Sequence, residues 1–245
     1  MKQRDSLTLS EYTSANNAAQ FWQGVKDCVP TLLGYLSIGF AAGVVQKTAG
    51  LSILEITLMS LLLYAGSGQF IAAGLIAASH PISAIIVTIF FVNLRHLLLS
   101  AAISPYFRHL SPWKNMIIGT HLTDETFGVA INKLPGKERA SFYWMLGLNI
   151  TAYLNWLVAN IAGAYFGKWI PNPEAYGLDF ALPAMFIGLL VLQMLSRKEY
   201  FVDILVGLSA VMIVVLVSFL FSGSTSIIVA TILGATIGMV IEKWI

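Results

Sequence analysis

The sequence predicts an all-α polytopic integral membrane protein with about seven to eight transmembrane helices. Of its 245 residues, 57% are hydrophobic and only 11% are charged, and the mean hydropathy is +0.77. Soluble domains carry roughly 25% charged residues, so a soluble fold of this composition would expose large apolar patches. The chain also contains several apolar stretches of about 20 residues, the length that crosses a hydrocarbon core of ~30 Å.

We expect a polar cytoplasmic tail over residues 1–24 and a single transmembrane transporter domain over residues 25–245. The tail lacks the apolar segment of a cleavable signal peptide. The expected spans are 28–47, 52–78, 82–104, 113–132, 140–168, 181–196, 200–221 and 224–243. The fourth has the weakest hydropathy, because it contains His121, Asp124 and Glu125.

The distribution of lysine and arginine favours eight spans with a cytoplasmic N-terminus. The residues then expected on the cytoplasmic side are Lys2, Arg4, Lys26, Lys133, Lys137, Arg139, Arg197, Lys198 and Lys243. Those expected outside are Lys47, Arg108, Lys114 and Lys168. A seven-span alternative, with one re-entrant segment, would place the C-terminus outside.

Three pairs of glycines lie four residues apart, namely Gly39/Gly43, Gly163/Gly167 and Gly234/Gly238. Such small residues let helix backbones approach closely within a membrane. We expect these pairs to pack helices within the chain, with a partner interface as the alternative.

The first candidate site is the stretch Tyr64-Ala-Gly66-Ser67-Gly68-Gln69-Phe70. Its glycines predict a broken helix near residues 65–69, and non-helical backbone inside a membrane has to be buried in protein or line a cavity. The freed backbone groups, with Ser67 and Gln69, could bind the charged head of a zwitterion. Alternatively, the stretch is a kink whose polar side chains bond to neighbouring helices.

The second candidate is Asn93-Leu-Arg95-His96, which lies inside the third apolar stretch. An arginine at the centre of a membrane helix costs at least ~2.5 kcal/mol, so Arg95 needs a partner or a wet cavity. The alternative is that its side chain reaches back to the membrane surface. Asn93 is a candidate substrate ligand beside it.

The third candidate is His121-Leu-Thr-Asp124-Glu125. If this stretch is one helix, His121 and Glu125 share a face. Two neighbouring carboxylates repel each other in a medium of low dielectric constant, so one keeps its proton unless a cation lies nearby. Arg95 is the available intramembrane cation, which predicts an ion pair with Asp124 or Glu125 and makes the other carboxylate a candidate proton carrier. The alternative is a surface loop with solvated charges.

Nothing in the sequence predicts an enzyme, a cofactor or a metal site. Cys28 is the only cysteine, so neither an internal disulfide nor a cysteine metal cluster can form. The HExxH, GxSxG and GxxxxGK[ST] signatures are absent. Without a nucleotide-binding loop, any transport is secondary or needs another subunit.

Taken together, these stretches resemble the AzlC family of branched-chain amino-acid export permeases over residues 24–243. The motifs that carry the resemblance are Gly-Val-Lys-Asp-Cys-Val-Pro30, Tyr64-Ala-Gly-Ser-Gly-Gln-Phe70, Arg95-His96, Leu-Thr-Asp124-Glu125-Thr-Phe127 and Leu182-Pro183-Ala-Met-Phe186. Members commonly carry an aspartate where this chain has Asn93, which leaves Asp124 and Glu125 as counter-ions of Arg95.

The resemblance implies export of leucine, isoleucine, valine or analogues, driven by an ion gradient, across the bacterial cytoplasmic (inner) membrane. It also implies a small membrane subunit of the AzlD family as partner. The chief alternative is a channel or structural membrane subunit without its own ion-coupled transport. Such a protein needs no titrating carboxylate, so Asp124→Asn and Glu125→Gln would leave its activity intact and independent of pH. An intramembrane hydrolase is a more distant alternative.

Overall fold

The computed structural model describes residues 9–134, 136, 138–170, 172, 174–196, 200–219, 233, 236, 237 and 240. The helices are α1 (Leu9–Thr48), α2 (Ile53–Leu62), α3 (Gly66–Ala77), α4 (Ile82–Phe107), α5 (Pro112–Thr120), α6 (Asp124–Lys133), α7 (Phe142–Phe166), α8 (Ala181–Ser196) and α9 (Tyr200–Ser218). Short 3-10 turns occupy Gly167–Trp169, Glu174–Tyr176 and Leu178–Phe180. Every element in the described ranges is helical, which confirms the predicted fold class.

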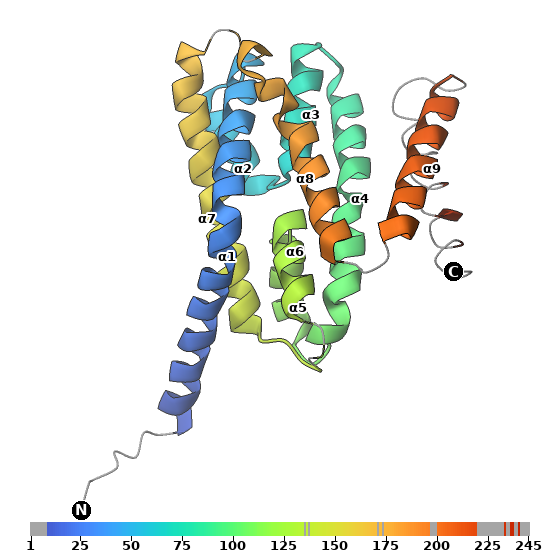
Figure 1. Cartoon of the computed structure of the whole chain (residues 1–245). Coiled ribbons are helices and arrows are strands. Elements are labelled where there is room, and N and C mark those ends of the chain that lie inside the picture. Colours follow the sequence, from blue (N-terminus) through green and yellow to red (C-terminus); the bar gives the residue numbers. More distant parts are fainter. Residues whose placement is uncertain are drawn as a thin grey trace, which may run out of the picture. The chain divides into compact units, whose positions relative to one another are not determined.

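The chain forms two compact units, Met1–Met185 and Phe186–Ile245. The first unit contains α1 to α7 and all three candidate sites (Figure 1). Within the described residues, Asn16–Thr48, Ile82–Phe107 and Phe142–Trp169 are long and apolar enough to cross a membrane. The expected span 224–243 and the pair Gly234/Gly238 lie outside the described residues, apart from four isolated positions.

Helices α1 and α7 lie side by side and run parallel, and glycines on both helices let their backbones touch. A Cβ at Gly24 or Gly43 of α1 would lie 2.0 or 2.1 Å from a carbonyl oxygen of α7. Likewise, a Cβ at Gly147 or Gly163 of α7 would lie 2.1 or 2.0 Å from a carbonyl oxygen of α1. The prediction that Gly43 and Gly163 pack helices within the chain is therefore confirmed.

The N-terminal tail is not separate from the first span. Residues 9–24 belong to α1, whose 40 residues extend over about 60 Å at 1.5 Å per residue. That length is about twice the hydrocarbon thickness, so part of α1 has to lie outside the membrane core. Contact with α7 already begins at Gln20 and Phe21, which lie against Ser141 and Gly147.

The stretch 52–78, expected to be one span, is instead a pair of half-length helices that enters and returns at the same end of the unit (Figure 1). At that end, Ile56 of α2 and Ala73 of α3 share a buried cluster with Ala164, close to the C-terminus of α7. At the turn, Tyr64 packs edge-on against Tyr153 in the middle of α7, with ring centroids 4.7 Å apart. We call α2 and α3 the first hairpin.

The stretch 113–132 is likewise a pair of half-length helices, which enters from the opposite end (Figure 1). Lys114 in α5 lies over the ring of Phe142 at the start of α7. The chain then turns at His121, whose ring packs 5.3 Å from that of Tyr153. Helix α6 returns, and Lys133 at its end pairs with Asp27 at 3.2 Å. We call α5 and α6 the second hairpin.

Local backbone chemistry explains both breaks. Tyr64 ends α2 in a left-handed conformation, with φ of +42°, a position that usually holds glycine. The predicted break near residues 65–69 is therefore confirmed, although the turn itself precedes the glycines and α3 begins at Gly66. In the second hairpin, Thr123 caps α6 by accepting a hydrogen bond from the Thr126 amide, and the Thr126 side chain bonds back to the Thr123 amide.

The two hairpins give the first unit an inverted order. A long helix followed by two short helices (α1 to α3) is repeated by α4 to α6, with the direction reversed. This order corrects the expected placement of Arg108 and Lys114, because both lie at the same end of the unit as Lys133. The Ala140 amide, which donates to the Tyr106 carbonyl at 3.0 Å, ties the end of α4 to that end. The expected sides of Arg108 and Lys114 are reversed because the second hairpin turns back and does not cross the membrane.

Site-directed labelling tests the two hairpins. With Cys28 replaced by serine, we expect single cysteines at Thr48 and His80 to react with a membrane-impermeant maleimide from one side of sealed vesicles. Cysteines at His109 and Glu138 should react only from the other side. If residues 52–78 crossed the membrane once, Thr48 and His80 would instead label from opposite sides.

The glycine contacts between α1 and α7 predict that Gly43→Ala lowers thermal stability. Its new methyl group would meet a backbone carbonyl that has no room to move, and such overpacking costs about 1–3 kcal/mol. Gly128→Ala in α6 is the matched control, because a Cβ there meets nothing within 4 Å. The unfolding temperature in detergent measures both variants, and an equal effect would contradict the close contact.

Candidate functional site

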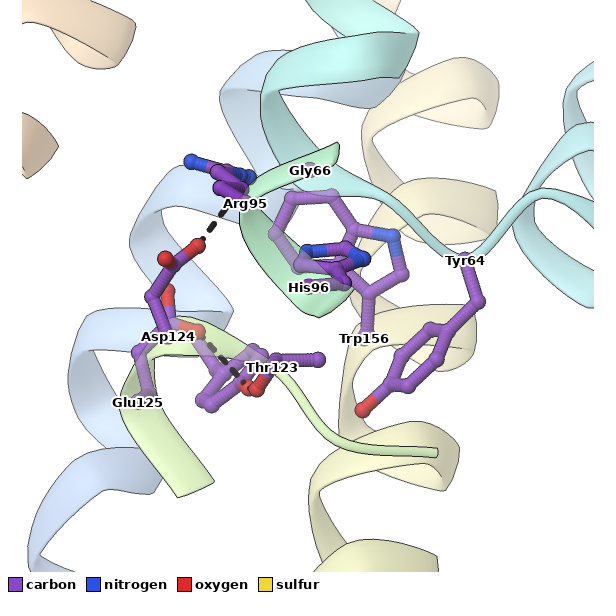
Figure 2. A pocket seen from close by; sticks show the side chains of 9 residues that line it. Tyr64, Gly66, Arg95, His96, Thr123, Asp124, Glu125 and Trp156 are labelled. Atoms are coloured by element: carbon purple, nitrogen blue, oxygen red, sulfur yellow. Dashed lines mark hydrogen bonds and ion pairs between the residues drawn. The ribbon is translucent and has the colours of Figure 1, made fainter. Parts of the chain in front are cut away.

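An ion pair joins α4 to the tip of the second hairpin. Arg95 lies near the middle of the 26-residue α4, and its guanidinium is 3.0 Å from the carboxylate of Asp124, the first residue of α6. Both side chains are about four-fifths buried, at 21% and 19% exposure. The predicted pairing is therefore present, and Asp124 rather than Glu125 makes it (Figure 2).

The second carboxylate, Glu125, is held by a hydroxyl group. Tyr35 in the middle of α1 donates a hydrogen bond to Glu125 Oε2 at 2.9 Å. The Tyr35 oxygen also lies in hydrogen-bonding contact with the Thr123 hydroxyl. Either hydroxyl can be the donor in that contact. The three groups thus form a hydrogen-bonded chain that ends on Glu125.

The tips of the two hairpins meet at a small cavity between α1, α4 and α7 (Figure 2). The residues that line it are Tyr35, Tyr64, Gly66, Arg95, His96, Thr123, Asp124, Glu125 and Trp156. The space inside accommodates about one water molecule. In this conformation the cavity is too small for an amino acid, which could bind only after the residues around it move.

The predicted residues of the first stretch separate into two groups. Tyr64 and Gly66 line the cavity. Ser67 is fully buried at the start of α3, and its hydroxyl has no hydrogen-bond partner among the described residues. Gly68 instead faces Asn93, because a Cβ on Gly68 would lie 3.6 Å from both amide atoms of that side chain. Asn93 therefore packs against α3 and does not line the cavity.

Gln69 belongs to a buried polar network that anchors the first hairpin. It donates to the Ser60 hydroxyl at 3.0 Å and accepts from Trp156 Nε1 at 2.7 Å. Gln69 Nε2 also lies 3.5 Å from Gln46 Oε1 on α1. Gln46 Nε2 in turn donates to Asn160 Oδ1 of α7 at 2.9 Å. The oxygen and the nitrogen of the Gln69 side-chain amide are thus both bonded to other side chains of this network. We infer that Gln69 holds Trp156 in place at the cavity, rather than contacting a ligand itself.

The two histidines have different positions. His96 follows Arg95 in α4 and lines the cavity. His121 lies in the turn of the second hairpin, where its Nδ1 is 3.1 Å from the Ile117 carbonyl. The expectation that His121 and Glu125 share a helix face was wrong, because the helix ends at Thr120 and restarts at Asp124. The capping of α6 by Thr123 is the physical reason for this break.

Three cavity residues were missed by the sequence analysis, namely Tyr35, Thr123 and Trp156. Thr123 had a usable signal, because a threonine directly before two acidic residues is typical of a helix start. Tyr35 and Trp156 had none, since an uncharged aromatic residue within an apolar stretch is ordinary. They reach the cavity only because α1 and α7 pack together.

Residues 30–170 match the family described as AzlC protein. The chain is 31% identical over 191 residues to the inner membrane protein YgaZ of Escherichia coli, covering 76% of this chain and 77% of that protein. It is 28% identical over 209 residues to the branched-chain amino acid transport protein AzlC of Bacillus subtilis, covering 82% and 81%. An uncharacterized membrane protein of Archaeoglobus fulgidus is 32% identical over 186 residues, covering 75% and 80%. No solved structure matches the chain.

The fold and the site together define a polytopic helical membrane protein with an ion pair buried between half-length hairpins. Within that class, the chain belongs to the AzlC family.

The buried ion pair predicts that Arg95→Ala is strongly destabilising. The substitution leaves Asp124 buried without its counter-charge. Removing one partner of a fully buried pair costs about 3–5 kcal/mol, and the cost is smaller here because both side chains are about a fifth exposed. Thermal unfolding in detergent should show a clear loss of stability, partly restored in the double variant Arg95→Ala/Asp124→Asn.

Arg108→Ala is the control for this prediction, because Arg108 is exposed at the end of α4. Surface substitutions usually change stability by no more than about 0.5 kcal/mol. Equal and mild effects of Arg95→Ala and Arg108→Ala would mean that water solvates Arg95.

Proposed function

We propose that this chain is the large subunit of a secondary transporter that exports branched-chain amino acids across the bacterial cytoplasmic membrane. In this proposal the proton gradient drives export, and a small AzlD-type membrane subunit completes the transporter. The observation that carries the proposal is the meeting of two oppositely directed hairpins at one buried, charged cavity.

Family membership supports branched-chain amino acids as the substrate. The Bacillus subtilis relative, which matches 82% of this chain, is named as a branched-chain amino acid transport protein. The cavity has a matching chemistry, because charged groups lie beside the apolar face of Trp156. A branched aliphatic side chain needs an apolar surface, and a zwitterionic head needs groups of both charges.

The inverted order of the helices supports alternating access. In many secondary transporters, inverted repeats place the substrate site near the membrane midplane, where broken helices meet. Here the tips of two hairpins that enter from opposite ends line the same cavity. Movement of one tip at a time would open the site to one side of the membrane without forming a continuous pore.

Glu125 is the proposed proton carrier. Arg95 balances the charge of Asp124, whereas Glu125 receives a hydrogen bond from Tyr35. Adding or removing a proton on Glu125 would therefore change the net charge of the cavity, which couples proton occupancy to substrate binding.

The basic residues support a cytoplasmic N-terminus. Among the described residues of the first unit, the end that holds the start of α7 carries five, namely Lys26, Arg108, Lys114, Lys133 and Arg139. The opposite end carries Lys47 and Lys168. Cytoplasmic loops are enriched in lysine and arginine, so the second hairpin would enter from the cytoplasm and the first from outside.

Flux measurements in proteoliposomes test the proposal. With the small partner present, we expect labelled leucine, isoleucine or valine to cross in response to an imposed proton gradient. Glu125→Gln should remove the dependence on that gradient, because glutamine has the same shape but cannot titrate.

Glu138→Gln is the matched control, since Glu138 is exposed between the second hairpin and α7. Flux that ignores the gradient in wild-type protein and survives Glu125→Gln would favour a channel. The complete absence of branched-chain amino acid flux, with the partner present, would refute the transporter proposal.

A further inference from the structure

One face of α7 contacts the end of the first helix in each hairpin. Asn149 and Tyr153 lie four residues apart near the middle of α7, so their side chains project from the same face. Asn149 Nδ2 donates to the Ile118 carbonyl in the last turn of α5 at 3.1 Å. The Tyr153 hydroxyl donates to the Leu61 carbonyl in the last turn of α2 at 3.0 Å. A single helix thus bonds both hairpins beside their turns.

These two carbonyl groups can accept a side chain because a helix ends at each of them. The last four carbonyl groups of an α-helix lack the usual partner four residues further on. Both bonds connect distant parts of the chain, since 31 residues separate Asn149 from Ile118 and 92 separate Tyr153 from Leu61. Each bond therefore fixes one hairpin turn against the pair formed by α1 and α7.

The ring of Tyr153 also lies between the two turns. It packs against Tyr64 in the turn of the first hairpin, with ring centroids 4.7 Å apart. It packs against His121 in the turn of the second hairpin, with centroids 5.3 Å apart. The ring therefore contacts both hairpins, whereas its hydroxyl group bonds only the first. Removal of the hydroxyl group alone would break that bond and leave both ring contacts in place.

We infer that Asn149 and Tyr153 are positioning residues that decide from which side of the membrane the cavity opens. Asn149 holds the second hairpin against α7, and Tyr153 holds the first. This inference rests on the proposed function, in which one hairpin tip moves at a time. Loss of the Asn149 bond favours movement of the second hairpin, and loss of the Tyr153 bond favours movement of the first. The two side chains therefore act in opposite directions on the same equilibrium.

The surroundings of the two bonds predict that their effects differ in size. Asn149 is only 1% exposed, and its bond to Ile118 is buried. The bond from Tyr153 to the first hairpin is exposed, and a hydrogen bond is weaker where the local dielectric constant is higher. In addition, Gln69 still accepts from Trp156 Nε1 and anchors α3 to α7 when the Tyr153 hydroxyl is absent. We therefore expect the larger effect from Asn149.

Chemical labelling of a cavity residue from each side of sealed vesicles tests the inference. In the full-length chain with Cys28 replaced by serine, His96→Cys places a thiol at the cavity, and a membrane-impermeant methanethiosulfonate is the probe. Asn149→Leu should raise the labelling rate about fivefold from the side that the second hairpin enters, the effect of losing one buried hydrogen bond. Tyr153→Phe should raise it at least about twofold from the opposite side.

Asn155→Leu is the matched control, because the Asn155 side chain donates to the Leu32 carbonyl of α1 at 3.0 Å and so joins α7 to a long helix. This variant should lower the unfolding temperature without changing the ratio of the two labelling rates. If Asn149→Leu behaves as Asn155→Leu does, Asn149 has a structural role only and the inference is overturned. Faster labelling of Tyr153→Phe from the side of the second hairpin would also overturn it. Tyr153→Phe keeps the packed ring and is expected to fold, so it decides the inference even if Asn149→Leu does not fold.

The positioning roles and the proposed function can fail separately, because labelling requires no substrate. Opposite shifts in labelling, without any flux of leucine, isoleucine or valine, would overturn the proposed substrate and support the positioning roles. Flux that follows the proton gradient, with equal changes in labelling from both sides, would overturn the positioning roles and leave the proposed transporter in place.

Discussion

The ion pair between Arg95 and Asp124 is the interaction on which the arrangement of the first unit depends. An arginine near the middle of a membrane helix has to meet a counter-charge or water, and Asp124 can meet it only at the same depth. A single helix over residues 113–132 would instead cross the membrane without a turn before Asp124. The break before α6, capped by Thr123, places the carboxylate at the middle of α4 and sends the chain back to the side from which it came.

The two hairpins are anchored to the rest of the unit in different ways. The first is fixed by buried amides, with Gln69 bonded to Ser60 and Trp156, and much of α3 is buried. The second buries fewer side chains, namely Ile118 in α5, Leu122 and Thr123 at the turn, and Thr126 and Ala130 in α6. It is held at both ends of α6, by Asp124 on Arg95 and by Lys133 on Asp27. Few buried contacts are typical of segments that open at low free energy, so the proposed movement of a tip is easiest to reconcile with the second hairpin.

A small cavity between the two hairpin tips links the structure to the proposed transport. The tip of the second hairpin contributes the two carboxylates, Asp124 and Glu125, and the tip of the first contributes Tyr64 and Gly66. The parallel pair α1 and α7, in glycine contact along its length, supplies Tyr35 and Trp156 to the same cavity and forms the frame against which either tip could move.

The sequence by itself determined the membrane environment, the helical class, the weak point near residues 65–69 and the need of Arg95 for an acidic partner. These conclusions follow from counting apolar and charged residues, because lipid penalises unpaired charge whatever the fold. Only the tertiary structure decided that residues 52–78 and 113–132 turn back, since hydropathy measures apolar length and not chain direction. The choice of Asp124 over Glu125, and the arrival of Tyr35 and Trp156 at the cavity, also required the structure. Each depends on how α1, α4 and α7 pack, which no local pattern in the sequence records.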